Sequence, residues 1–470
     1  MRAFLYLITC TCFFLLSFSL QAQHVKVSVD SISITGNNKT NDHIILREIL
    51  FSVGDSVAIS RLPGMLDTSI MNVLNTRLFV EVYVNFQPLN RNSIIITVDV
   101  KERWYVYPQF SLSLADRNFN VWWYEKDHKL NRLEYGVGMV AFNLTGNNDP
   151  LRLNFVFGFA NKFAASYDLP FFNEKTKLGG GASFAYQTNR QVYYTTKENA
   201  QVFFESDENV RKKIKADINL HTRNNIFYTT GIKLQFNHVE ITDSIAHLNP
   251  DYLGGGRKIL DFPVVSLHFA DNHTDNHQYP LQGHYFEAEI NKIGFGSPVN
   301  QVSIALQANG YKPLSSKFFI ASMLATKMNF SKDYPYYLLE SLGYCEFFVR
   351  GYEYYVVDGQ HTFLLRNNIK WKFIDWKVKP PIIQSDKIEE IPVQVYLKLF
   401  ADAGYVIDNY YNGENPLSNS FLYSAGLGID ITSSYNWVFR LESAVNAMGE
   451  LGVFLHLGLD LTTYEACSIW

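Results

Sequence analysis

The chain has 470 residues, of which 18% are charged and 15% are aromatic, whereas soluble proteins carry about 25% charged residues. The formal net charge of −4 and the pI near 6.3 show that the chain has no excess of basic residues, so we expect no nucleic-acid partner. With 36 Phe and 29 Tyr, the composition favours a membrane barrel that carries aromatic girdles.

Residues 1–23 have the pattern of a secretory signal peptide, and we exclude them from the fold. Arg2 supplies the basic start, residues 4–20 are apolar, and Leu20-Gln21-Ala22 offers a cleavage site. No later stretch has 18 consecutive apolar residues, which argues against a helical membrane span. An exported chain without such a helix can still cross a membrane as a closed barrel.

Residues 24–103 are predicted to form a separate small α+β domain. Strand-like alternation and two stretches with the 3.6-residue helical period give the order β-α-α-β-β, with Ser60 as the expected cap of the second helix. The predicted elements lie at 25–35, 42–50, 60–74, 78–85 and 94–100.

Residues 104–470 are predicted to form a transmembrane β-barrel, because segments of alternating polarity follow one another between Gly, Asn, Asp and Pro turns. We count about sixteen segments, an even number that returns both ends of the barrel to one side. They begin near Trp104 and continue near 132–144, 151–160, 163–171, 177–188, 208–222, 226–240, 261–271, 283–293, 299–310, 317–329, 361–372, 392–402, 421–431, 437–446 and 451–461. The connection 373–391 is long on the side where short turns are expected, and the sequence gives no reason for it.

A charged tetrapeptide, Val349-Arg350-Gly351-Tyr352, lies in the loop after the eleventh segment, residues 330–360, which we call the lid loop. A guanidinium facing lipid would cost several kcal/mol, so we expect Arg350 to turn into the lumen and to pair with a carboxylate. Asp402 is the natural partner, because it lies in the polar phase of the segment near 392–402.

These motifs resemble those of the BamA/TamA superfamily of outer-membrane insertases. The tetrapeptide resembles the family's VRG(F/Y) signature, and residues 400–404 (FADAG) resemble the strand motif whose acid binds the signature arginine. Residues 32–37 (ISITGN), with Gly54-Asp55 and 76–79 (TRLF), resemble a POTRA domain. The resemblance implies a mainly β protein, with a 16-stranded barrel in the bacterial outer membrane and one POTRA-like domain in the periplasm. Asn368 stands in a strand where the family usually carries an acid, which weakens any second charge contact to Arg350.

The first and last strands are predicted to form a weak seam. Pro108 removes one ladder donor from the first strand, and proline is tolerated chiefly at sheet edges. A seam that opens would expose backbone groups able to template an incoming strand. The alternative is that Pro108 only marks the strand start and that the barrel stays shut. The residues assigned to the seam are Pro108, Phe110, Leu112, Leu455, Leu457 and Gly458.

The expected function is to assist assembly and insertion of other outer-membrane proteins, through the seam and the lid loop. The alternatives are a two-partner-type secretion translocator and a passive channel or structural barrel. The expected partners are outer-membrane lipid, unfolded outer-membrane clients or a secreted substrate, and accessory periplasmic or lipoprotein subunits. We expect no enzyme, no catalytic residue and no cofactor, because no spacing singles out a nucleophile with an oriented base. We also expect no metal at His268, His273, His277 and His284, whose irregular spacing crosses a turn.

Overall fold

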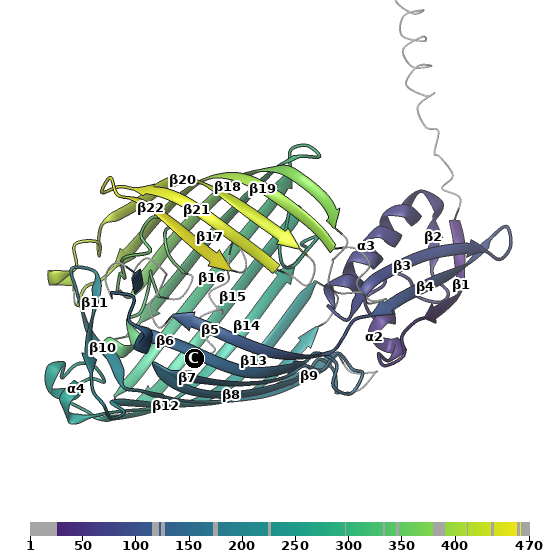
Figure 1. The fold of residues 1–470 in the computed structure, drawn as a ribbon. Helices are drawn as coiled ribbons and strands as arrows, with labels where there is room; N and C mark the ends of the chain where they lie inside the picture. The colour runs from purple at the N-terminus through teal and green to yellow at the C-terminus, as the bar shows by residue number, and fades with distance from the viewer. Residues whose placement is uncertain are drawn as a thin grey trace, which may run out of the picture.

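The computed structural model consists of a small front domain and a rolled sheet of sixteen strands (Figure 1). The predicted signal peptide, Gly458 and the tail 462–470 lie outside the described residues. The structure describes residues 26–114, 122–123, 127–172, 177–223, 227–296, 298–331, 334–344, 347–378, 391–410, 412–433, 437–457 and 461.

The front domain packs two helices against a four-stranded sheet. Strand order is β2-β1-β4-β3, with β1 parallel to β4, and the core includes Ile45, Val73 and Ile96. The predicted order omits β2, which has only three residues, too few to show alternation. Ser60 lies in a 3-10 turn and makes no side-chain cap. The elements are β1 (Lys26–Thr35), α2 (Asp42–Leu46), β2 (Ser56–Ala58), α3 (Leu62–Asn75), β3 (Phe79–Pro88) and β4 (Ser93–Glu102).

Sixteen antiparallel strands form the second part, as the alternation predicts. In sequence order, the strands of this sheet are β5 (Val106–Leu114), β6 (Leu133–Ala141), β7 (Leu151–Gly158), β8 (Ala160–Leu169), β9 (Leu178–Asn189), β12 (Arg211–Arg223), β13 (Tyr228–Ile241), β14 (Ile259–Asn272), β15 (Gly283–Gly296), β16 (Val299–Pro313), β17 (Phe318–Phe330), β18 (His361–Val378), β19 (Ile391–Ile407), β20 (Phe421–Ser433), β21 (Trp437–Asn446) and β22 (Leu451–Leu457).

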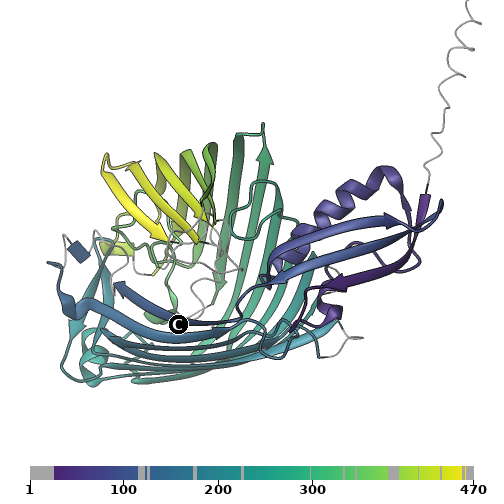
Figure 2. The ribbon, with the colours of Figure 1, turned by 45° about the vertical axis from the view of Figure 1, so that its right-hand side comes forward.

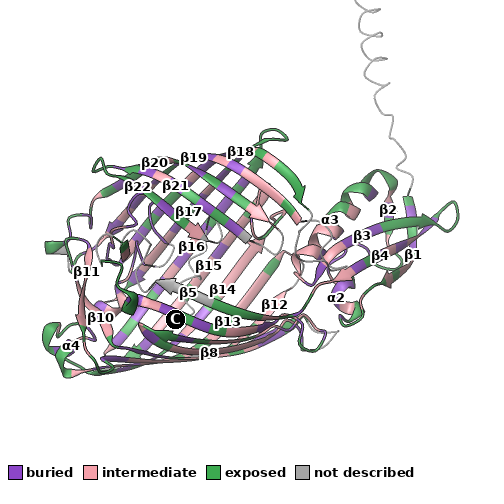
Figure 3. Ribbon diagram, in the orientation of Figure 1, coloured by how far each residue is buried: buried purple, intermediate pink, exposed green. Residues whose placement is uncertain are grey.

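The two faces of each strand differ in polarity, as expected for a lipid-facing barrel. In β19, Lys398 and Asp402 are buried on the inner face, whereas Leu399 between them is 61% exposed on the outer face. Figure 3 shows the same striping of buried and exposed residues along the strands of the sheet. Among the described residues, no helix is long and apolar enough to cross a bilayer.

The long connections gather at the end of the barrel away from the front domain (Figure 1). They carry a hairpin of β10 (Gln191–Lys197) and β11 (Ala200–Glu205), and helix α4 (Asp243–Leu248), none of which the sequence analysis foresaw. The predicted connection 373–391 was placed wrongly in part, because β18 continues to Val378 and pairs with Ile391 of β19. The connecting residues 379–390 lie outside the described part of the chain.

β5 and β22 are the two ends of the sheet, and no ladder joins them within the described residues (Figure 2). The closed barrel that we expected is therefore rolled, but it is not closed by strand pairing in the part that the structure describes. Both end strands are short, nine residues in β5 and seven in β22, compared with 18 in β18. β5 is as long as its neighbour β6, whereas β22 is the shortest described strand of the sheet.

Candidate functional site in the barrel lumen

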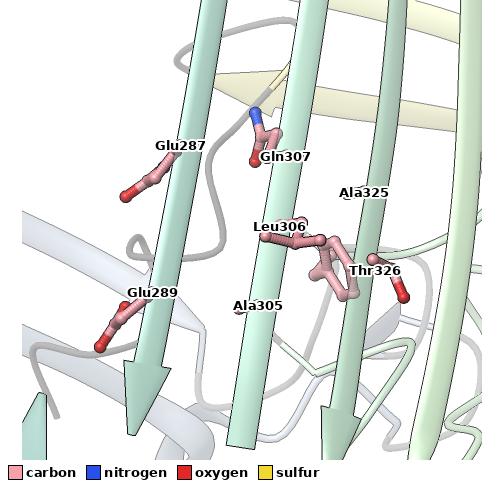
Figure 4. A pocket seen from close by; sticks show the side chains of 8 residues that line it. Glu287, Glu289, Ala305, Leu306, Gln307, Ala325 and Thr326 are labelled. Carbon is pink, nitrogen blue, oxygen red and sulfur yellow. The ribbon is translucent and has the colours of Figure 1, made fainter. Parts of the chain in front are cut away.

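The lid loop, predicted at residues 330–360, begins after Phe330 at the end of β17 and folds against the inner wall of the barrel. Phe347, Val349 and Tyr352 belong to one apolar cluster with inward residues of the wall. Phe347 lines a small hollow on β15–β17, where the wall offers the small side chains of Ala305 and Ala325 (Figure 4). Small residues therefore make room for the loop.

Arg350 is 1% exposed and is bound to Asp402 of β19 by two side-chain hydrogen bonds. Its Nε donates to Asp402 Oδ2 at 2.7 Å and its Nη2 donates to Oδ1 at 2.6 Å. The backbone N–H of Arg350 also donates to Oδ2, at 3.2 Å. The guanidinium lies 3.9 Å from the centroid of Phe400 on the same strand. This planar, two-bond geometry is available to arginine and not to lysine.

A second carboxylate contacts the same guanidinium. Glu442 of β21 lies 3.4 Å from Arg350 Nη1, and Lys398 Nζ lies 2.6 Å from Glu442 and 2.7 Å from Asp430. Arg440 completes the group at 3.9 Å from Glu442. All five side chains are buried. Because isolated charges are costly to bury, this mutual compensation allows the loop arginine to sit inside the wall.

Two glycines of β20 allow β19 side chains to reach across to β21. The register places Lys398, Gly428 and Glu442 side by side on neighbouring strands. A Cβ at Gly428 would lie 2.9 Å from the Lys398 side chain. A Cβ at Gly426 would lie 2.1 Å from the backbone carbonyl oxygen of Ser443 and 2.4 Å from the Phe400 ring. Alanine at either position would displace the side chains that contact Arg350 or Glu442.

The tip of the lid loop is held by the end of β21. Gly351 has φ +89°, a conformation that favours glycine, and its carbonyl accepts a hydrogen bond from the Asn446 side chain at 2.9 Å. The Tyr352 hydroxyl accepts from the backbone N–H of Ala447 at 3.2 Å. The tetrapeptide therefore contacts β19 and the end of β21, two strands that flank β20 in the sheet.

Arg366 and Glu353 extend the network on either side of the tetrapeptide. Arg366 of β18 donates to the carbonyl of Phe348 at 3.1 Å and lies 3.9 Å from Asp402. Glu353 accepts a hydrogen bond from the Gly351 N–H at 2.6 Å. Glu353 is a loop residue outside the strands, and burial raises its pKa to about 8, with the charge of Glu442 adding to the rise.

We expect the lid loop to loosen as pH rises, because ionisation of Glu353 is unfavourable in the folded loop. The folded pKa of about 8 lies above the ordinary glutamate value of 4.5, so stability is fully present below pH 4.5 and is lost as pH rises through 8. Hydrogen exchange of residues 349–357, corrected for the intrinsic rate, should be faster at about pH 9 than at about pH 6. Glu353→Gln keeps a side-chain oxygen acceptor and should remove this pH dependence; an equal dependence in that variant would contradict the assignment.

The outer end of the lid loop is tied to two other loops by Asn199, in the turn of the β10–β11 hairpin. Asn199 is 1% exposed. Its backbone carbonyl accepts a hydrogen bond from the Val356 N–H at 2.8 Å, and its side-chain amide donates to the Val356 carbonyl at 3.1 Å. It also binds the Asn415 side chain at 3.0 Å and the Leu417 N–H at 2.9 Å. These bonds join three loops over the end of the barrel away from the front domain.

At the opposite end, the front domain is docked on the barrel through Glu48. Both Glu48 oxygens accept from Arg223 of β12, at 2.6 and 2.9 Å, and Arg47 binds Glu48 at 3.3 Å. The Arg47 guanidinium also lies 3.5 Å from the ring centroid of Phe171. Beside these contacts is a cavity of about 420 Å³, lined by residues of both parts, including Arg77 and Arg152.

The structure brings together Arg350 and Asp402, and it places the predicted seam residues on the two end strands. Phe110 and Leu112 of β5 are 82% and 75% exposed, and Leu455 of β22 is 49% exposed. Pro108 faces Met139 of β6 in the ladder. Leu457 ends β22, and Gly458 lies outside the described residues.

Sequence reasoning missed Glu442, Arg440 and Glu353 as members of this site. The second charge contact to Arg350 comes from Glu442 of β21, not from the strand of Asn368, where the family pattern placed an acid. The alternation of Val438, Arg440, Glu442 and Ala444 marks the inner phase of β21 and could have identified both charges as inward.

Comparison with known proteins agrees with this architecture. No family model matches the chain. It is 24% identical over 316 residues to "Outer membrane protein assembly factor BamA" of Neorickettsia risticii (strain Illinois), a match that covers 65% of the chain but only 37% of that relative. Solved structures of similar fold are BamA from Haemophilus ducreyi lacking POTRA domains 1–3 and CdiB from Escherichia coli. The BamA structure has a TM-score of 0.52 and 16% sequence identity, and the match covers 92% of this chain and 84% of the BamA chain. The CdiB structure has a TM-score of 0.54 and 13% sequence identity, and the match covers 94% of this chain and 92% of the CdiB chain.

Proposed function

We propose, for a chain similar to BamA in sequence and to BamA and CdiB in fold, that it assists the insertion of other proteins into the outer membrane. The barrel lies in the outer membrane, with the front domain on the periplasmic side. The resemblance to the BamA/TamA superfamily is thus confirmed by sequence and fold. The client, the accessory subunits and the mechanism are part of the proposal.

One observation carries the proposal: the described parts of β5 and β22 end the sheet without pairing to each other. An unpaired strand edge exposes N–H and C=O groups that are costly to leave unsatisfied in lipid. An incoming strand that adds to β5 would satisfy these groups and would extend the sheet. The side chains of Phe110 and Leu112 would keep the outer face of the edge apolar.

A two-partner-type translocator would instead pass its substrate through the lumen, which requires the lid loop to leave the wall. The bidentate Arg350–Asp402 pair and the Asn199 contacts both oppose that movement. A passive channel is supported least, because three loops meet over one end of the barrel and the lid loop occupies part of the lumen. We therefore favour action at the edge of the sheet over passage through its interior.

Photocrosslinking tests the proposal at the strand edge. A photoreactive amino acid at Phe110 should capture an unfolded outer-membrane barrel protein of the same bacterium while that protein is being inserted. The matched control is Ile218, which is 59% exposed on the outer face of the interior strand β12. Capture at position 110 and not at 218 is the expected result. Equal capture at both positions, or capture at neither, would contradict insertion at the seam.

A further inference from the structure

The histidines near the β14–β15 turn separate into three environments. His268 points to the inner face of the wall and lies 3.1 Å from Glu287. His277 lines the cavity between the front domain and the barrel. His273 and His284 lie together with Asp271 at the periplasmic rim.

The rim cluster lies on the outer face of the sheet. Asp271 shares the phase of Leu267, and His284 shares the phase of Ile290; these two apolar residues are 53% and 47% exposed. His273 immediately follows β14, and its backbone N–H donates to the carbonyl of His284 at 2.9 Å. The cluster therefore borders the apolar band at its end nearest the front domain.

The three side chains converge on one point. Asp271 Oδ1 lies 2.6 Å from His273 Nδ1, and Asp271 Oδ2 lies 3.5 Å from His284 Nε2. One ligand atom of each residue falls within 4.8 Å of the other two. The imidazole rings of His273 and His284 are stacked, with their centroids 4.7 Å apart. The Phe227 ring also stacks on the His273 ring, with centroids 3.9 Å apart, and this contact restricts the orientation of the His273 ring.

Contrary to the expectation from the irregular histidine spacing, we propose that Asp271, His273 and His284 form a binding site for a divalent transition-metal ion of the Zn²⁺ class. Two imidazole nitrogens and one carboxylate oxygen make a three-ligand set that leaves a position open to water. Zinc binds nitrogen and oxygen at about 2.0–2.2 Å, which requires ligand atoms about 3.3 Å apart. The contacts of 2.6 and 3.5 Å bracket this value. The two imidazole planes are only 19° from parallel, and a ring nitrogen binds a metal in the plane of its ring. The Asp271 carboxylate must therefore rotate, and the 56% exposed His284 side chain must turn out of the stack, for the three ligand atoms to meet one ion.

A metal ion would compete with a proton for His273 Nδ1 in this cluster. In the metal-free form, the 2.6 Å contact between Asp271 and His273 holds one shared proton. A metal bound to His273 Nδ1 takes the place of that proton, which either leaves or moves to Nε2 of the same ring. The competing explanation is that the three side chains only hydrogen-bond to one another.

The test uses the full chain in detergent, with a purification tag that lacks histidine, after treatment with chelator. Zn²⁺ affinity is measured by competition with an indicator dye, and Co²⁺ absorption reports the coordination geometry. His284→Ala and Asp271→Asn should each weaken one Zn²⁺ site by about 10–100-fold or more, since loss of even an outer-shell partner has that effect. His268→Ala, on the inner face of the same strand, is the matched control and should bind as the unaltered chain does.

Each outcome decides the proposal. Loss of the site in both rim variants, with retention in His268→Ala, supports it. Equal weakening in His268→Ala, or no difference between the unaltered chain and His284→Ala, would show that the three residues only hydrogen-bond to one another. Heat-modifiable migration on gels identifies any variant that fails to form the barrel, and His284→Gln then replaces that variant in the same titration.

Discussion

Replacing Arg350 with alanine is expected to release the lid loop from the wall while the barrel remains inserted. The change leaves Asp402 buried without its two-bond partner, and removal of one member of a buried ion pair costs about 3–5 kcal/mol. Asp402→Ala should act similarly, because it removes the two short hydrogen bonds of the Arg350 guanidinium and leaves the longer 3.4 Å contact to Glu442. Hydrogen exchange of residues 347–358 should accelerate in both variants.

The matched control is an exposed ion pair on the same sheet. Lys212 and Glu240 lie 3.5 Å apart with side chains 40% and 45% exposed, so Lys212→Ala should cost at most about 1 kcal/mol. It should leave exchange in the lid loop unchanged. Normal loop protection in both Arg350→Ala and Asp402→Ala would reject the pairing as the anchor of the loop.

Replacing Glu48 with alanine is expected to loosen the front domain from the barrel. The Glu48 side chain is only 2% exposed and binds Arg223 through two bonds and Arg47 through one, so its removal takes three hydrogen bonds from two guanidiniums at the junction. Arg223 is 29% exposed, so water will compensate part of the loss, and we expect about 1–3 kcal/mol. Spin-label distances between α3 and the rim of β12 should broaden.

Glu81→Ala is the control for this experiment. Glu81 pairs with Lys101 at 3.3 Å within the front domain, and its side chain is 41% exposed. The variant should keep the narrow distance distribution of the unaltered chain. An unchanged distribution in Glu48→Ala would mean that the remaining contacts of the junction hold the domain without this ion pair.

Much of the fold follows from local pattern. Alternation of polar and apolar residues identifies each strand of the barrel because lipid on one side and a polar lumen on the other impose a two-residue period. The same period places Lys398 and Asp402 inside. The two-residue period does not identify the part of a strand that extends beyond the apolar band, as at residues 373–378 of β18. Lipid and lumen do not impose alternating polarity on such an extension.

The composition of the site was predicted only in part, because it depends on cross-strand register. Asp402 could be paired with Arg350 from a motif and a phase, but Glu442 reaches the same guanidinium from β21, two strands away from β19. Which residues face one another across β20 is set by pairing partners, and one sequence does not specify them. Gly426 and Gly428, which permit the crossing, are recognisable only once that register is known.

Hydrogen exchange of β5 tests the central claim most directly, since insertion at the seam requires an available edge. In the inserted protein, amides of Val106–Leu114 should exchange much faster than those of β14, which is paired on both sides. Addition of an unfolded barrel client should then slow exchange in β5 and leave β14 unchanged. Uniformly slow exchange in β5, equal to that of β14 before any client is added, would contradict the account.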